Sequence, residues 1–344
     1  MKLIIDAMGG DNAPLEIVKG ALSGQKRWGV DVTLTGDTTA ILQALEACGE
    51  KTLPQGMEIV HTTETVEMCD DPATVFRRKK DTSMGVGLTM LRDGRADAMV
   101  SAGSTGALLT GATLIVKRIR GIRRAAMAPV IPTTTGQAVL IDCGANAECT
   151  PEYLVQFAYL GSYYAHRVLG VERPRVGLLN IGTEDSKGTD LQKETLRWLR
   201  EAHTAGHLNF IGNIEAKEAI KGGCDVIVCD GFSGNVLLKT MEGVGKFLLK
   251  SLKEMFLSST KTKLAAGLVK GDLGQMKKLL DPSEVGGTPF LGIQKPVIKA
   301  HGGSNARAIE NAVLRAKEYA ESGFIADIQA NIEHMRVQPG MEKN

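Results

Sequence analysis

Six segments of the sequence place glycine beside small polar or charged side chains directly after a short apolar run. Glycine lets backbone N–H groups turn toward a ligand, and a helix that starts after such a loop adds partial positive charge. One such loop is typical of an ordinary helix start, but several at one sheet edge favour a site for phosphate or pyrophosphate. The segments are AMGGDN (7–12), AGSTG (102–106), CGAN (143–146), IGTEDSKGT (181–189), DGFSGN (230–235) and AHGGSN (300–305).

The candidate phosphate- and substrate-binding residues lie in these loops or at the ends of the runs before them. Ser104, Thr105 and Asn235 could cap a helix or donate to an oxyanion. The candidates are Asp6, Gly9, Gly10, Ser101, Gly103, Ser104, Thr105, Gly106, Asn146, Asn180, Gly182, Glu184, Asp230, Gly231, Ser233 and Gly234.

Two further side chains of these loops could carry charge or a proton. Lys187, in TEDSKG, could neutralise phosphate or an oxyanion as a point charge, although a solvated loop lysine fits the position equally well. His301, in KAHGGSN, could act as a donor or acid, or it could be a hydrogen-bonded structural histidine.

Fingerprints of other chemistries are missing from the sequence. There is no G-x-x-x-x-G-K-[ST], no G-x-G-x-x-G after a strand, no G-x-S-x-G and no H-E-x-x-H. The six cysteines lack metal spacing, and Cys143 and Cys229 lie in apolar runs typical of core residues in a reducing compartment. We therefore expect no metal, no cofactor and no covalent side-chain nucleophile.

A sheet must position these loops. Short runs that are apolar at both odd and even positions alternate with longer helical patterns. This alternation predicts an α/β fold with a doubly wound, mostly parallel Rossmann-like sheet. Ligands of such sheets bind outside the carboxyl ends of the strands. The predicted strands are Leu3–Asp6, Asp31–Thr35, Glu58–His61, Ala98–Ser101, Ala138–Asp142, Arg175–Asn180, Asn209–Gly212, Asp225–Cys229 and Pro296–Lys299.

One region breaks this alternation. From Asn235 to about Leu280 the sequence predicts a long helix and then a second one, and residues 246–280 hold eight Lys and two acidic residues, a net charge of +6. We expect a protruding, basic amphipathic helical hairpin at 243–285, with the apolar segment Leu264–Val269 at its tip. It is inserted in a single α/β catalytic domain over residues 1–330, and residues 331–344 are expected to form a flexible tail.

Composition excludes several classes of function. The 344 residues carry a net charge of +2 and 4% aromatic residues, which argues against a nucleic-acid binder. The N-terminal run is too short for a signal peptide, and no run reaches the ~18 apolar residues of a membrane span. These features favour a cytoplasmic protein.

Longer motifs resemble one family over nearly the whole chain. DAMGGD, SAGSTGALL, GLLNIGTEDSKG, NFIGNIE, DVIVCDGFSGNVLLKTMEG and KAHGGSNARAI are similar to the PlsX family, the phosphate acyltransferases of bacterial phospholipid synthesis. The resemblance implies transfer of a fatty acyl group from acyl-[acyl-carrier protein] to inorganic phosphate, giving acyl phosphate and the free carrier thiol. It also implies a homodimer with a fold akin to phosphate acetyltransferases and isocitrate-dehydrogenase-type proteins. The hairpin would contact the inner face of the cell membrane, and the product would pass to a membrane glycerol-3-phosphate acyltransferase.

This reaction gives the loop residues their expected roles. Attack of phosphate on a thioester needs a dianion held in line with the carbonyl and donors for the developing oxyanion. We expect Lys187 to position phosphate or stabilise that oxyanion, and Asn235 to donate a hydrogen bond to the same centre. His301 would protonate the leaving thiolate or hold phosphate.

Two surfaces would serve the partners. An acidic carrier protein calls for a basic docking face, and apolar side chains beside lysines suit binding at a lipid interface. The alternatives are a solvated helix face for the first surface and a dimer interface for the second. The docking residues are Arg77, Arg78, Lys79, Lys80, Arg118, Arg120, Arg123 and Arg124, and the membrane residues are Leu264, Ala265, Ala266, Gly267, Leu268 and Val269.

Three rival functions differ in the chemistry they require. A coenzyme A-dependent phosphate acetyltransferase differs only in the acyl donor. A nicotinamide-linked decarboxylating dehydrogenase needs a nucleotide fingerprint and clustered aspartates, which the sequence lacks. A non-catalytic membrane scaffold would leave the six ligand-type loops unexplained.

Overall fold

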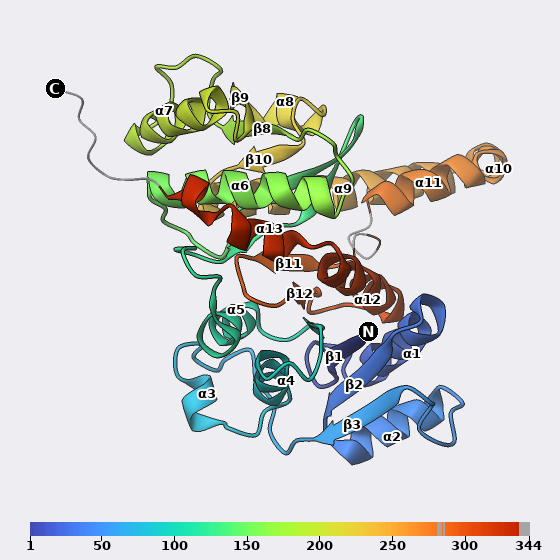
Figure 1. Ribbon diagram of the computed structural model, residues 1–344. Helices are drawn as coiled ribbons and strands as arrows, with labels where there is room; N and C mark the ends of the chain where they lie inside the picture. Colours follow the sequence, from blue (N-terminus) through green and yellow to red (C-terminus); the bar gives the residue numbers. More distant parts are fainter. Residues whose placement is uncertain (281–283, 285, 337–344) are drawn as a thin grey trace.

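The chain forms an α/β structure, as the sequence predicts, but its strands are divided between two sheets (Figure 1). The computed structural model describes residues 1–280, 284 and 286–336. The first sheet has the order β3-β2-β1-β4-β12-β11-β5, and the second has the order β6-β7-β10-β8-β9.

The first sheet is built from both ends of the chain. Its strands β3, β2, β1, β4 and β12 are parallel, whereas β11 and β5 complete one edge in antiparallel pairing. Leu3 and Ile5 face one core cluster and Ile4 faces another, so β1 is covered on both sides. The strands are β1 (Lys2–Asp6), β2 (Asp31–Gly36), β3 (Met57–His61), β4 (Ala98–Ser101), β5 (Ala126–Met127), β11 (Thr288–Leu291) and β12 (Val297–Lys299).

The second sheet uses the middle of the chain. Strands β7, β10, β8 and β9 are parallel, and β6 pairs antiparallel with β7. Each of the nine predicted strands is present in one sheet or the other. The strands are β6 (Val130–Thr133), β7 (Gly136–Ile141), β8 (Arg175–Leu179), β9 (Asn209–Ile214) and β10 (Val226–Val228).

Helices cover both sheets, and an aromatic cluster joins α6 to α12 and α13. The rings of Tyr164, Tyr319 and Phe324 meet edge to face, with centroids 5.3–6.1 Å apart. The helices are α1 (Leu15–Trp28), α2 (Thr38–Ala47), α3 (Val75–Arg78), α4 (Ser83–Arg92), α5 (Thr105–Gly111), the π-helix η1 (Ala112–Lys117), α6 (Pro151–Arg167), α7 (Asp190–Thr204), α8 (Ala216–Ile220), α9 (Gly231–Leu257), α10 (Thr260–Leu268), α11 (Lys270–Leu280), α12 (Ala306–Glu321), α13 (Phe324–Ala330) and the 3-10 helix η3 (Ile332–Met335).

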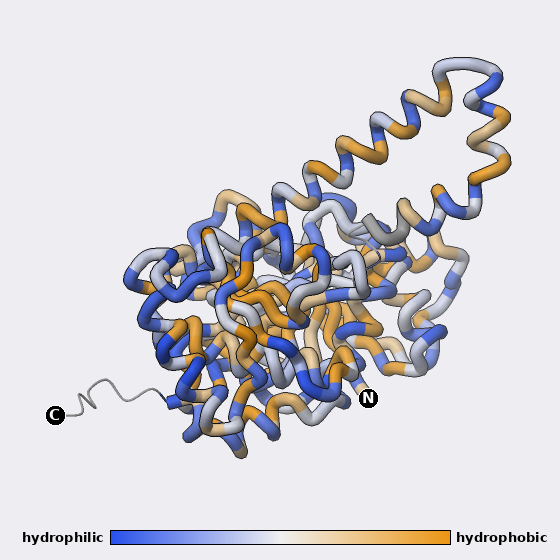
Figure 2. Tube along the Cα trace, turned by 90° about the horizontal axis from the view of Figure 1, so that it is seen from above, coloured by the Kyte–Doolittle hydropathy of each residue, from blue (hydrophilic) through white to orange (hydrophobic). Residues whose placement is uncertain are grey.

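Helices α9, α10 and α11 form a hairpin that projects from the body of the protein (Figure 2). Helix α9 runs outward, the chain turns at Ser258 and Ser259, and α10 lies at the outer end of the hairpin (Figure 1). Helix α11 then returns toward the body of the protein. The segment Leu264–Val269 therefore lies at the outer end of the hairpin, close to the predicted tip (Figure 1). The hydroxyl of Ser259 accepts a hydrogen bond from the Thr262 N–H, which starts α10 directly after the turn.

The remaining boundaries differ from expectation in smaller ways. Residues 281–283 and 285 of the expected hairpin lie outside the described residues, as do residues 337–344 of the expected tail. The described part of that tail includes η3, where Met335 is buried. Across the described ranges, no helix has both the length and the hydropathy needed to cross a bilayer.

Candidate active site

The six glycine-rich loops leave the carboxyl ends of two sets of neighbouring strands. Strands β1, β4 and β12 are adjacent in the first sheet, and β7, β10 and β8 are adjacent in the second. Each sheet thus contributes three of the predicted loops, rather than all six leaving one sheet. Parallel neighbours lie about 4.8 Å apart, so each set of three loops starts close together.

In the first sheet, Asp6 is the centre of the loop cluster. Its buried carboxylate accepts hydrogen bonds from Ser83 Oγ at 2.6 Å and Ser101 Oγ at 2.7 Å. Burial raises the pKa of Asp6, while the two serine hydroxyls oppose that rise. The carboxylate therefore fixes the ends of β1 and β4 to α4 and is too buried to be a free ligand.

Glycine is needed here because the loops touch through their backbones. A Cβ at Gly9 would lie 2.7 Å from the Gly103 nitrogen, and one at Gly10 would lie 2.8 Å from the Gly302 oxygen. Gly10 also has a φ of +104°, a region that other residues rarely adopt. The structure thus brings the loops 7–12, 102–106 and 300–305 together.

The residues of these loops differ in their exposure to solvent. Ser104 is the N-cap of α5 and accepts from the Ala107 N–H, so its capping interpretation is confirmed. Thr105 and Gly106 follow in the first turn, where Gly106 is exposed. His301 is exposed, and its Nδ1 accepts the Gly303 N–H at 3.1 Å. The part of the His301 ring that is buried, together with the charges of Lys239 and Lys299, lowers its pKa.

In the second sheet, Asp142 has the corresponding position at the end of β7. Its buried carboxylate accepts from the N–H groups of Met127 at 2.8 Å, Cys143 at 2.7 Å and Asn146 at 2.6 Å, and from Asn146 Nδ2 at 3.1 Å. Burial raises the pKa of Asp142 against the lowering effect of these donors. Because Met127 belongs to β5 of the first sheet, this carboxylate also joins the two sheets.

The first turn of α9 packs directly on this loop. Asp230 is the N-cap and accepts from the backbone N–H and hydroxyl of Ser233, both at 2.8 Å. A Cβ at Gly231 would lie 2.5 Å from the Asn146 oxygen, and one at Gly234 only 2.0 Å from the Asp142 oxygen. Asn235 is exposed, and its side chain lies about 3.7 Å from the ideal Cβ position of Gly144. Asn146, Asp230, Gly231, Ser233, Gly234 and Asn235 therefore form one cluster.

Lys187 lies in the third loop of the second sheet. The Asn180 amide donates to the Lys187 oxygen at 3.2 Å, and the Lys187 N–H donates to the Glu184 oxygen at 3.1 Å. Gly182 packs against the Lys187 stem, and the side chain of Lys187 is exposed. Since β8 and β10 are neighbours, the loops of Lys187 and Asn235 leave the same edge side by side.

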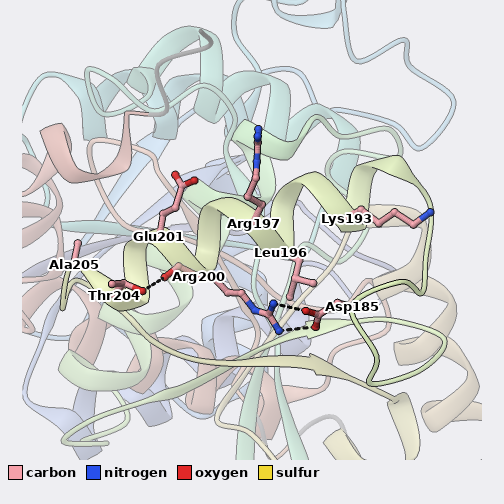
Figure 3. Close-up of a pocket in the computed structure, with 8 residues that line it drawn as sticks. All are labelled: Asp185, Lys193, Leu196, Arg197, Arg200, Glu201, Thr204 and Ala205. Atoms are coloured by element: carbon pink, nitrogen blue, oxygen red, sulfur yellow. Dashed lines mark hydrogen bonds and ion pairs between the residues drawn. The ribbon is translucent and has the colours of Figure 1, made fainter. Parts of the chain in front are cut away.

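A groove of about 690 Å³ lies beside this loop along α7 (Figure 3). Lys193, Arg197 and Arg200 line it together with the acidic Asp185 and Glu201. Arg200 forms an ion pair with Asp185, which fixes the Lys187 loop to α7.

Two of the cysteines agree with the sequence interpretation. Cys143 and Cys229 are buried, which confirms them as core residues, and burial raises the pKa of Cys143 to about 12. Within residues 1–280, 284 and 286–336, no three His, Cys, Asp or Glu side chains gather as a metal site would require.

The predicted docking residues fall on two segments. Arg77 and Arg78 are exposed on α3, whereas Lys79 pairs with Asp70 at 2.7 Å. In the loop between η1 and β5, Arg118 donates to the Arg123 oxygen, Arg123 pairs with Glu152 and Arg124 lies over the Tyr153 ring. Arg77 and Arg78, like Lys80 and Arg120, are therefore exposed charges among the predicted docking residues.

Two lysines near the loops were not singled out by the sequence. Lys299, the last residue of β12, is buried, and Lys239 of α9 pairs with Glu242 at 2.9 Å. The charge of Lys239 acts to lower the pKa values of Lys299, His301 and Cys143. It therefore acts on residues at the loops of both sheets. In the sequence, Lys299 could have been identified as a charged residue at the end of an otherwise apolar strand.

Comparisons with known proteins agree with one another. Residues 1–327 match a family model described as "Fatty acid synthesis protein". The phosphate acyltransferase of Clostridioides difficile is 45% identical over 329 residues, 95% of each chain, and that of Oceanobacillus iheyensis is 47% identical over 334 residues, 97% of this chain and 98% of its own.

Solved structures share the fold at low identity. A phosphotransacetylase from Streptococcus pyogenes superposes with a TM-score of 0.64 at 19% identity and covers 93% of this chain and 94% of its own. A branched-chain phosphotransacylase from Enterococcus faecalis gives 0.55 at 16% identity, with 94% of this chain and all of its own covered.

Proposed function

This chain belongs to the family of fatty acid synthesis proteins whose curated relatives are phosphate acyltransferases, and we propose that it transfers a fatty acyl group from acyl-[acyl-carrier protein] to inorganic phosphate. The observation that carries the proposal is 43–47% identity to those relatives over nearly the full length. The two clusters of glycine-rich loops support it, since each brings glycine backbone and small polar side chains together beside the start of a helix, an arrangement suited to an anion.

In the proposed reaction, a phosphate oxygen attacks the thioester carbonyl carbon. The carbonyl π electrons move to oxygen, and their return breaks the C–S bond, giving acyl phosphate and a carrier thiolate that takes up a proton. We assign Lys187 to the negative charge of phosphate or of the tetrahedral oxyanion, and Asn235 to a hydrogen bond with the same centre. Their places on loops after adjacent strands support this assignment. His301 is assigned to hold phosphate or protonate the thiolate.

Thiol release from palmitoyl-carrier protein, measured with and without inorganic phosphate, tests the function. We expect release only with phosphate, and much slower release from acetyl-coenzyme A. Release at equal rates without phosphate would contradict the proposal, and faster use of acetyl-coenzyme A would favour a phosphate acetyltransferase.

Lys187→Ala tests the assigned charge. We expect kcat to fall about 100-fold, because a charge that acts on the transition state contributes several kcal/mol. Lys221→Ala is the matched control, since Lys221 is an exposed lysine that precedes β10, at the opposite end of that strand from the loops. A folded Lys187→Ala protein with full turnover would remove Lys187 from the mechanism.

The docking surface is proposed at Arg77 and Arg78 of α3. Exposed guanidinium groups attract an acidic carrier and raise its association rate. Reversal of both charges to Glu should raise the KM for the acylated carrier several-fold, while Arg173→Glu, an exposed charge before β8, should not. An unchanged KM after the double reversal would exclude this surface.

The hairpin is proposed to bind the membrane surface. Leu264 and Leu268 of α10 are 70% and 89% exposed, and lysines flank them in the sequence. Replacing both by Glu should abolish flotation with anionic liposomes, whereas Leu42→Glu on α2 should leave it intact. Undiminished flotation of the hairpin variant would contradict the proposal.

The remaining partners are also proposals. We propose a homodimer in the cytoplasm, to be tested by light scattering after size exclusion. The acyl phosphate would be consumed by a membrane glycerol-3-phosphate acyltransferase, and membranes containing that enzyme should convert the product to an acylated glycerol phosphate.

A further inference from the structure

Lys299 is a buried lysine at the edge of the first sheet where the loops begin. It is only 6% exposed, and it ends β12, whose three residues are all buried. Lysine is among the residues least often buried unless its charge has a partner. A buried ammonium at this position therefore needs hydrogen-bond acceptors or a negative charge nearby.

The ammonium joins the ends of two strands. Lys299 Nζ donates to the backbone oxygen of Ala102 at 3.3 Å and to that of Ala300. Ala102 directly follows β4 and Ala300 directly follows β12, and the last bond between these segments runs from the Ala300 N–H to the Ser101 oxygen at 2.9 Å. The lysine thus closes the pair of strands at the point where their loops diverge.

Acidic groups compensate the buried charge. Burial lowers the pKa of Lys299 to about 8, and Asp6 and Asp11 oppose this fall while Lys239 adds to it. The ammonium is therefore charged at neutral pH. Asp6 is itself held by Ser101 at the end of β4, and the Asp11 N–H donates to the Gly302 oxygen at 2.8 Å. The ends of β1, β4 and β12 are thus joined by hydrogen bonds and by the attraction between the Lys299 ammonium and the two carboxylates.

We propose that Lys299 is a positioning residue for phosphate. Its ammonium holds the loops 102–106 and 300–305 at a fixed spacing, so that their backbone donors and His301 converge on the anion. This inference rests on the proposed function, because it assigns these loops to the phosphate substrate. Loss of the ammonium would leave two buried carbonyl oxygens without their donor and free the loops to separate.

The test is the KM for inorganic phosphate of Lys299→Met, which keeps the length of the side chain but removes the charge. We expect that KM to rise about tenfold, the effect of losing hydrogen bonds from a charged donor, while the KM for the acylated carrier stays within about twofold. A merely structural role would lower the amount of active enzyme and hence kcat, with both KM values unchanged. An unchanged phosphate KM overturns the proposal.

A second variant and a control complete the experiment. Asp6→Asn with Lys299→Met removes both charges, so no unpaired buried charge remains, and the double variant should fold and still show the raised phosphate KM. Lys317→Met is the matched control, because Lys317 Nζ also donates to a backbone oxygen, that of Trp28, but near the far end of α12.

The outcomes separate the two proposals. A double variant that fails to fold, or that binds phosphate normally, overturns the role of Lys299. Wild-type protein that releases no thiol on addition of phosphate overturns the proposed function instead.

Discussion

Replacing Asp142 by Asn should weaken both the fold and the reaction. The change keeps the shape of the side chain but turns one carboxylate oxygen into an NH₂ group. Oδ1 accepts from the Met127 and Cys143 N–H groups, and Oδ2 accepts from the N–H and Nδ2 of Asn146. Whichever side the new nitrogen takes, it faces at least two donors, since the Ala145 N–H also lies 3.4 Å from Oδ1.

The magnitude follows from those bonds. Two hydrogen bonds to a charged acceptor are lost, each worth about 1.5–3 kcal/mol, and removal of a buried charge returns part of that loss. We expect a net decrease of about 2–4 kcal/mol in the free energy of unfolding. The Gly231 N–H donates to the Asn146 oxygen at 2.8 Å, so the first turn of α9 should shift with the loop, moving Asn235 and lowering kcat about tenfold.

Urea unfolding at pH 7, followed by circular dichroism, measures the first effect, and phosphate-dependent thiol release measures the second. Asp37→Asn is the control, because Asp37 caps α2 through the Ala40 N–H and Asn caps a helix equally well. An Asp142→Asn protein within about 0.5 kcal/mol of wild type would refute the role given to this carboxylate.

Three further changes test other parts of the structure. Gly234→Ala should destabilise the protein by more than about 2 kcal/mol in urea unfolding, because its Cβ would lie 2.0 Å from the Asp142 oxygen; a neutral result would mean that α9 starts elsewhere. Partial burial raises the pKa of Asp225, but hydrogen bonds from Arg175 outweigh it, so the pKa is lowered overall. The ionised carboxylate therefore stabilises the fold above about pH 4, and this stabilisation is lost as the pH falls. Asp225→Asn should therefore cost about 1 kcal/mol in urea unfolding at pH 7, since solvent screens the half-exposed Arg175, and less at pH 3; an equal cost at both pH values would contradict this. The Tyr319 hydroxyl is buried and has no hydrogen-bond partner among the described residues, so Tyr319→Phe should raise the free energy of unfolding by about 0.5–1 kcal/mol; a clear loss would mean that the hydroxyl is satisfied.

The strands could be predicted from sequence mainly where they are buried in parallel sheets. Their runs are apolar at every position, as in β1 and β10. The antiparallel strands β5, β6 and β11 are not visible in the sequence pattern, because they have two to four residues and two of them contain proline. The division into two sheets also escaped prediction, since strand order depends on contacts distant in sequence.

The candidate site was predictable as a set of loops but not as a set of contacts. Glycine with small polar residues after a strand marked each loop, and the structure places all six at the carboxyl ends of strands. The sequence does not mark Asp142 and Lys299 as site residues, because a charged residue at a strand end normally reaches solvent. Only the packing of neighbouring loops shows that both are buried.

Helix α9 has a mechanical consequence. Its 27 residues make a rod of about 40 Å that begins against Asp142 and ends near the turn at Ser258. A tilt of about 5° at the base swings the far end by about 3.5 Å, and the same leverage works in reverse. A force on the outer end therefore acts as a torque on the first turn of α9, which carries Asn235. Binding at the outer end of the hairpin and the geometry of the proposed reaction centre are thus mechanically coupled.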